Sequence, residues 1–283
     1  MNNNKSIRIV VILILSYIFV GCKSKLDIIK ENSNADFRYN KAVEYFNAGR
    51  EIAQNKKAGS YKYFIASKEL FESVKDAYKA SSKSEEMLYG WANATYYAGS
   101  DLFTARMLYK TLASEFPNGK YAEEANYMIV KCLYEESPSD YTLDQSTTYE
   151  AINAINWFFS LYPNSKYAEE CNNLMSNLDE RLKKKSFEDA KLFFTIRKYP
   201  AAIVALNNAL KEYPDTKYRE TIEFLIIKSK YIYATNSHAN KQRERFISTL
   251  ESCKEFIEKY PLNKNIKAVE EIREISNQNI ISS

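Results

Sequence analysis

The stretch YPNSKYAEECNNL, residues 162–174, has close relatives at FPNGKYAEEANYM (116–128) and YPDTKYRETIEFL (213–225). A weaker version, YPLNKNIKAVEEI, covers residues 260–272. The prolines of successive copies are 46, 51 and 47 residues apart, and spacings of this size are typical of repeat proteins. The chain is therefore expected to repeat one structural unit along most of its length.

A helical pattern leads into each of the four prolines. Small residues stand twelve positions before them, and mostly apolar or aromatic residues stand eight, five and one positions before them. These intervals of four, three and four residues trace one face of a helix. Proline then ends the helix, because it has no backbone N–H to donate and clashes with the preceding turn. The polar and acidic residues that follow are typical of a turn and a new helix start, so the repeating unit is a pair of helices.

The composition favours long helices over strands. Only 6 Gly and 6 Pro interrupt 283 residues, while 23 Tyr and 15 Phe supply bulky side chains for packing. The hydrophobic share of 45% and the charged share of 27% are ordinary for a folded soluble protein. We predict an all-α, tetratricopeptide-like helical-repeat solenoid with about five helix pairs and a C-terminal capping helix.

The predicted helices divide into two groups. The N-terminal repeats, residues 36–162, are expected to hold three helix pairs, and the C-terminal repeats, residues 163–283, two pairs and the capping helix. The fourth pair begins with an unusually long helix, and the basic run RLKKK (181–185) in its middle is interpreted as a solvated face or as a contact for an acidic partner. The expected helices are 36–49 and 61–80, 85–98 and 101–116, 120–136 and 147–162, 166–198 and 201–213, 217–234 and 242–260, and 266–280.

Residues 1–21 are typical of a secretory signal peptide, because two basic residues precede an apolar run, Ile9–Val20. A helix of that length rises only about 18 Å, which is short of the roughly 30 Å hydrocarbon core of a bilayer. The run ends in FVGC, which resembles a bacterial lipobox except that Phe19 replaces the usual Leu. We therefore expect Cys22 to carry a covalent lipid, palmitate included, and residues 22–35 to form a flexible tether. A secreted protein without the lipid is the alternative.

Motifs of catalysis are absent from the sequence. It contains no nucleophile elbow, no Gly-rich phosphate loop and no HExxH, and its single His238 lies in a polar segment expected to be a solvent-exposed loop. Cys132, Cys171 and Cys253 take repeat positions of small or apolar residues, so we expect them in the core, with a disulfide, metal or redox role as the alternative. We expect no enzyme, no cofactor beyond the lipid on Cys22, no metal and no nucleic acid.

Several segments resemble a known family. Small residues at these offsets, aromatic-Pro turns and paired helices resemble the tetratricopeptide repeat. Taken with the lipobox and the five helix pairs, the order of four segments is similar to the BamD or YfiO family of β-barrel assembly lipoproteins, in the form found in Bacteroidetes. The segments are YTLDQSTTYEAI (141–152), YPNSKYAEE (162–170), KSFEDAKLFF (185–194) and YPDTKYRE (213–220).

This resemblance implies a scaffold for outer-membrane protein assembly. The implied partners are a BamA-type barrel protein, whose POTRA domains dock on the C-terminal repeats, unfolded outer-membrane proteins bound by the N-terminal repeats, and other assembly lipoproteins. By the sorting rules of such lipoproteins, an acylated Cys22 without a following Asp implies the periplasmic face of the outer membrane. The main alternative is a YbgF- or CpoB-like periplasmic adaptor for envelope constriction or cell-wall synthesis. A SusD-like glycan-capturing lipoprotein and an enzyme on a helical-repeat scaffold are further alternatives.

Helical phase predicts a peptide-binding groove on the first helix of each N-terminal pair. Tyrosine rings there would offer apolar area to an extended peptide, together with a hydroxyl for its backbone. The alternative is that these tyrosines complete the packing between helices. The predicted groove residues are Tyr39, Val43, Phe46, Tyr89, Asn93, Tyr96, Tyr127, Lys131 and Tyr134.

Overall fold

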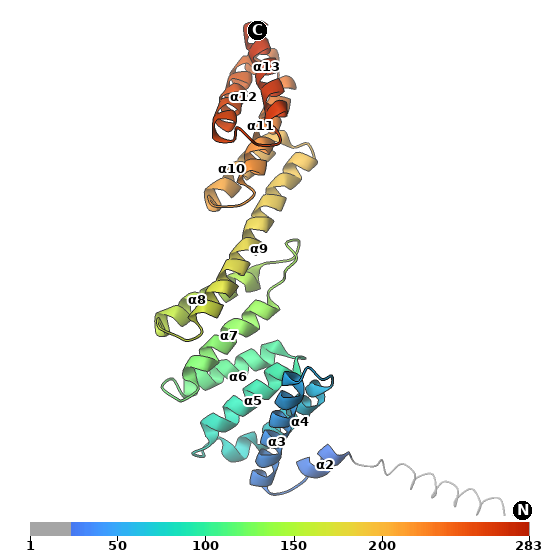
Figure 1. Cartoon of the computed structure of the whole chain (residues 1–283), viewed down its shortest axis with the longest axis vertical. Helices are drawn as coiled ribbons and strands as arrows, with labels where there is room; N and C mark the ends of the chain where they lie inside the picture. The colour runs from blue at the N-terminus through green and yellow to red at the C-terminus, as the bar shows by residue number, and fades with distance from the viewer. Residues whose placement is uncertain (1–23, 283) are drawn as a thin grey trace, which may run out of the picture. The chain divides into compact units, whose positions relative to one another are not determined.

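The structure, a computed structural model, describes residues 24–282 (Figure 1). This part of the chain contains twelve helices and no strand, so it has the all-α, tetratricopeptide-like fold predicted from the repeats. In chain order the helices form five pairs and a last helix, after a short first helix. They are α2 (Lys25–Lys30), α3 (Ala35–Gln54), α4 (Ser60–Tyr78), α5 (Ser84–Ala98), α6 (Leu102–Glu115), α7 (Ala122–Glu136), α8 (Ser146–Leu161), α9 (Ala168–Thr195), α10 (Tyr199–Glu212), α11 (Arg219–Thr235), α12 (Ala239–Lys259) and α13 (Ile266–Ser282).

The predicted leader, residues 1–21, and Cys22 lie outside the described residues. Within residues 24–282, no helix combines the length and the apolar character needed to cross a membrane.

The chain divides into two compact units. The first runs to Glu136 and includes Phe158–Ser165, and the second consists of Ser137–Trp157 and the chain from Lys166 onward. The division therefore differs from the expected boundary between residues 162 and 163. The reason is that the loop after α7 packs on α9: Arg181 Nη1 donates to Ser137 O at 2.9 Å, and Lys185 Nζ donates to Tyr141 O at 3.1 Å.

The segment after Cys22 is folded from Lys25 onward. Ser24 and Asp27 form a capping box at the start of α2, and Ile29 is buried in the core of the first unit. Lys30 Nζ lies 2.8 Å from Glu69 Oε2 of α4. The prediction of a flexible tether over residues 22–35 is therefore wrong for its described helical part, because a single amphipathic turn suffices to pack on α3 and α4.

Small residues let the helices approach closely, as the repeat pattern predicts. The four positions twelve residues before the prolines, Ala105, Ala151, Ala202 and Thr249, are fully buried. Gly90 of α5 faces the buried ring of Phe71 on α4, and these helices lie side by side in Figure 1.

The turn after each proline is attached to the preceding repeat. Ser165 Oγ donates to Glu123 Oε1 at 2.6 Å in the first unit, and Asn263 Nδ2 donates to Glu220 Oε2 at 2.5 Å in the second. Both donors stand two residues after their own proline, and both carboxylates stand six residues after the preceding one. The acidic residues that open the helices thus also join successive repeats through charge-assisted hydrogen bonds.

Aromatic stacking attaches the turns after the other two prolines, Pro117 and Pro214. The ring of Tyr121 lies 3.8 Å from that of Tyr89, with 9° between the planes, and Tyr218 lies 4.6 Å from Phe187, with 6° between the planes. Tyr121 and Tyr218 are the tyrosines of the repeated Lys-Tyr pair. The recurring sequence therefore encodes both a helix boundary and a contact between repeats.

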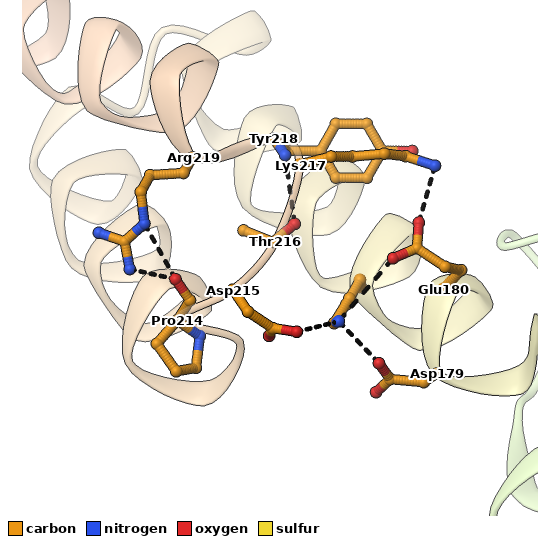
Figure 2. A network of polar contacts seen from close by, with 9 residues as sticks. Asp179, Glu180, Pro214, Asp215, Thr216, Lys217, Tyr218 and Arg219 are labelled. Carbon is orange, nitrogen blue, oxygen red and sulfur yellow. Dashed lines mark hydrogen bonds and ion pairs between the residues drawn. The ribbon is translucent and has the colours of Figure 1, made fainter. Parts of the chain in front are cut away.

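The basic run 181–185 forms its hydrogen bonds and ion pairs within the second unit, and Figure 2 shows the acidic residues Asp179, Glu180 and Asp215 near its middle. Lys183 is buried, and its Nζ contacts Asp179 Oδ2 at 2.7 Å and Asp215 Oδ2 at 2.6 Å. Glu180, next along α9, pairs with Lys217 at 2.7 Å. Neither interpretation of the run, a solvated face or a contact for an acidic partner, accounts for the buried Lys183, because it contacts acidic groups of its own chain.

The structure confirms the prediction that the three cysteines lie in the core. Cys132, Cys171 and Cys253 are free and fully buried. Burial raises the pKa of Cys132 to about 12 and the pKa values of Cys171 and Cys253 to about 11, so all three are neutral thiols at pH 7. His238 is exposed at the N-terminal end of α12, as predicted.

Candidate peptide-binding face

The first helices of the second and third pairs meet through two tyrosine–carboxylate hydrogen bonds. Tyr89 Oη of α5 donates to Glu124 Oε1 of α7 at 2.8 Å. Two turns further along, Tyr96 Oη donates to Glu135 Oε1. Seven residues separate the two tyrosines, so they stand on one face of α5. Both tyrosines are half-buried.

Lys131 of α7 places its ammonium group near two tyrosine rings, one on α5 and one on α7. Its Nζ lies 6.0 Å from the ring centre of Tyr96 and 5.8 Å from that of Tyr127. Such contacts hold an ammonium group over the negative face of an aromatic ring. Of the predicted groove residues, the structure thus brings Tyr89, Tyr96 and Lys131 together on adjacent helices. We call these three residues with Glu124 and Glu135 the α5–α7 face.

An aromatic cluster adjoins this face through Tyr97. Its ring lies 5.3 Å from Phe64 and 6.0 Å from Phe46, and Tyr96 meets it edge-on at 5.2 Å. Tyr97 remains 48% exposed, more than most aromatic residues of the first unit. Sequence reasoning missed Tyr97, because the helical phase selected its neighbour Tyr96. The adjacent Tyr pair was the available signal, because neighbouring residues of a helix point about 100° apart, so that both rings of the pair had to be considered.

Three of the predicted groove residues are buried. Tyr39 stacks on Tyr78 at 4.8 Å, and Asn93 accepts a hydrogen bond from Tyr109 Oη at 3.0 Å. Tyr127 is buried 6.3 Å from the ring of Phe158. The prediction that these three line an accessible groove is wrong, because phase gives a side chain's direction around its helix but not how far the next helix covers it. For them, the alternative of inter-helix packing holds.

Two further predicted residues are half-buried. Val43 packs against the core cluster that contains Phe71, and Tyr134 lies near the C-terminal end of α7. Phe46, also half-buried, belongs to the aromatic cluster around Tyr97.

Hydrogen bonding sets what the tyrosines can offer to a ligand. Burial, and then the bonds to Glu124 and Glu135, raise the pKa values of Tyr89 and Tyr96 above the ordinary range of a phenol. Both stay neutral, and each O–H is already donated to a carboxylate. The phenol oxygens and the carboxylates can therefore accept hydrogen bonds from the N–H groups of a bound peptide, whereas the phenols have no further proton to donate.

The second unit exposes an apolar patch at the end of its longest helix. Leu192 and Phe193 of α9 and Ile196, the C-cap residue that follows it, are exposed. Phe193 also lines a cleft of about 320 Å³ with Ala205 and Tyr213 of the α10 region. Contiguous exposed apolar side chains are typical of protein interaction sites. We call Leu192, Phe193 and Ile196 the α9 patch.

Groups of acidic, His or Cys side chains suited to a metal ion do not occur within residues 24–282. The α5–α7 face presents aromatic area, hydrogen-bond acceptors and the ammonium group of Lys131.

Comparison with known proteins places the chain in a family. A family model described as YfiO, outer membrane lipoprotein, matches residues 40–246, which is more than half of the chain. The match begins within α3 and ends within α12, so it contains the α5–α7 face and the α9 patch. No curated protein matches the chain significantly.

Proposed function

Because the chain belongs to the YfiO family of outer membrane lipoproteins, we propose that it is a lipid-anchored scaffold that assembles β-barrel proteins at the periplasmic face of the outer membrane. The family match over the helical repeats is the observation that carries this proposal. The repeats would supply binding surfaces and no catalysis, in keeping with a scaffold rather than an enzyme.

The α5–α7 face is the proposed site for unfolded outer-membrane proteins. Barrel strands alternate apolar and polar side chains and expose their backbone until they pair. Tyr96 and Tyr97 offer ring surface to the apolar side chains, and Glu135 offers an acceptor to backbone N–H groups. Rigid aromatic residues bind with little loss of side-chain entropy, which suits a site that must accept many sequences.

The α9 patch is the proposed docking site for a BamA-type protein with POTRA domains. Its exposed apolar side chains support this assignment, which agrees with the expected role of the C-terminal repeats. Other assembly lipoproteins would join the same complex. A common membrane anchor raises the effective concentration of the partners, so contacts of modest affinity suffice.

Acylated Cys22 is the proposed anchor. One acyl chain holds a protein on a membrane only marginally, whereas two or more hold it stably. The alternative of a YbgF- or CpoB-like adaptor is not favoured, since the matching family model is that of the YfiO lipoproteins.

Site-specific photo-crosslinking in intact outer membranes tests the proposal. A photoreactive residue at Phe193 is expected to link to a POTRA-bearing barrel protein, and one at Tyr97 to newly exported barrel chains. Phe103 and Ile275, which are also exposed, serve as control positions in the first and second units. Links from Phe193 to cell-wall synthases, with none to a barrel protein, would favour the adaptor function instead.

A further inference from the structure

The folded body begins very close to the anchoring cysteine. Only two residues separate Cys22 from Lys25, the first residue of α2, and a fully extended chain spans at most about 10 Å over that distance. α2 itself cannot swing freely, because Ile29 is buried and Lys30 is paired with Glu69. If Cys22 is acylated, the part of the first unit around Lys25 must therefore lie at the membrane surface.

The side chains around Lys25 suit that position. Lys25 lines a cleft of about 480 Å³ together with Tyr45 and Tyr63, whose rings are 6.1 Å apart, and with Lys62. Ile28, on α2, is 61% exposed, and Tyr61 at the start of α4 is 52% exposed. Tyrosine and lysine side chains are enriched at membrane interfaces, because each joins an apolar part to a polar end.

The loop between α3 and α4 adds positive charge at the same end of the helices. Residues 50–62 contain four basic side chains and one acidic one. Lys56, Lys57 and Lys62 are exposed, and none of them is in an ion pair within the described chain. Each Lys near an anionic bilayer strengthens binding by roughly five-fold at moderate ionic strength.

We propose that the α3–α4 loop and the exposed side of α2 form a second, noncovalent contact with anionic phospholipid headgroups. Lys56, Lys57 and Lys62 bind the phosphates, while Tyr61, Tyr63 and Ile28 enter the interface. The contact orients the first unit on the bilayer, which a lipid attached at one point cannot do. This inference rests on the anchor proposed for Cys22.

The contact is tested by a fluorescent label on the protein, whose quenching by groups at headgroup depth reports how close it lies to the membrane surface. The native cysteines of the described chain are buried, so Ala58→Cys, an exposed site in the loop, can be labelled selectively. Ser114→Cys is the control, because it is exposed at the C-terminal end of α6, and successive antiparallel helices place that end opposite the α3–α4 loop. The acylated protein is reconstituted in vesicles of phosphatidylethanolamine and phosphatidylglycerol at 3:1, with quenchers attached at headgroup depth.

Strong quenching at residue 58 and little at residue 114 is the expected result. The variant Lys56→Gln/Lys57→Gln/Lys62→Gln should lose the quenching at residue 58, because the three charges together account for up to about 100-fold in headgroup affinity. The variant Lys79→Gln/Lys110→Gln/Lys120→Gln removes the same charge from other exposed sites and should behave like the parent protein. Equal quenching at both labels, or none at residue 58, would overturn the proposal.

Mass spectrometry of the N-terminal peptide separates this inference from the anchor on which it rests. If Cys22 proves unacylated, the anchor proposal fails, and flotation of the mature chain with the same vesicles replaces the quenching measurement. Binding that the loop triple variant loses and the control triple variant keeps would support the contact. Absence of binding by the parent chain would refute it.

Discussion

Lys183 Nζ lies 2.6 Å from Asp215 Oδ2, although 32 residues separate them along the chain. The contact joins the middle of α9 to the turn after Pro214, so it links one repeat to the next (Figure 2). Lys183 is only 7% exposed, and Asp179 contacts the same ammonium group from within α9. A buried lysine of this kind is stable because it is paired on both sides.

The Lys183–Asp215 pair predicts a dependence of stability on pH. Hydrogen bonds to Asp179 and Asp215 raise the pKa of Lys183, and the bond from Lys183 lowers the pKa of Asp215. The lysine's contribution is complete below its unfolded pKa of about 10.4 and is lost as pH rises through its raised folded pKa. The carboxylate's contribution is present above an unfolded pKa of about 3.9 and is lost as pH falls through its lowered folded pKa.

Asp215→Asn should therefore destabilise the protein at pH 7 and have much less effect at about pH 2.5. Urea denaturation followed by circular dichroism at both pH values measures the difference. Asp76→Asn, at another exposed position, is the matched control and should change little at either pH. An equal loss for Asp215→Asn at both pH values would show that the ion pair is not its cause.

Gly90→Ala should destabilise the protein, although alanine is the better helix former by about 1 kcal/mol. A Cβ atom on Gly90 would lie 2.5 Å from Cζ of the buried Phe71, and overpacking of this kind costs about 1–3 kcal/mol. Chemical denaturation measures the net loss. In Phe71→Leu, where the ring is gone, the same Gly90→Ala change should cost less, and a double-mutant cycle that shows no such coupling would contradict this explanation.

Ser165→Ala should lower the free energy of unfolding by about 1 to 2 kcal/mol. The hydroxyl donates to the carboxylate of Glu123, and hydrogen bonds to charged groups contribute more than neutral ones. Denaturant titration of the whole chain checks the value. Ser114→Ala removes the same hydroxyl at an exposed position and should stay within about 0.5 kcal/mol of the parent protein.

Tyr97→Ala should weaken binding of unfolded barrel segments by about 10-fold or more, as truncation of a central interface tyrosine commonly does. Fluorescence anisotropy with a labelled barrel-strand peptide measures the affinity. Phe103→Ala removes another exposed aromatic ring of the first unit and should leave the affinity unchanged. Equal affinities for the two variants would remove the aromatic cluster from the proposed cargo site.

Cys22→Ser, exported behind a leader that is cleaved without lipid attachment, should keep its helicity and lose stable membrane association. The folded units contain their own cores, so the anchor contributes nothing to their packing. Membrane fractionation and circular dichroism provide the two measurements. Firm retention of this variant in membranes at high salt would refute the lipid anchor, because salt screens the remaining attraction of the loop lysines.

Much of the fold could be predicted from local pattern. The predicted helix 101–116 corresponds to Leu102–Glu115, and the predicted capping helix from residue 266 begins where α13 does. Apolar spacing and proline stops operate within one or two turns, so they can be read from adjacent residues. The short α2 escaped prediction, because a helix of six residues has too few positions to show a period.

The candidate site was predicted less well than the fold. Tyr89, Tyr96 and Lys131 lie together on adjacent helices, whereas Tyr39, Asn93 and Tyr127 belong to the core, and Tyr97 was missed. Exposure depends on the neighbouring helix, whose distance and rotation follow from many side chains at once. A helical phase contains no information on that neighbour.

The amino-acid sequence by itself determined that this protein is a chain of helix pairs, because spacing, proline and turn residues act locally. It also determined the core positions of the three cysteines, since each follows from its place in the repeat. Only the tertiary structure decided that Glu123 and Glu220 join successive repeats and that Lys183 is paired with Asp215. It also decided that the body begins at Lys25, directly after the proposed anchor. These features depend on contacts between residues some 30 to 45 positions apart in the chain, or on the packing of α2 against α3 and α4, and their geometry exists only once the helices have packed.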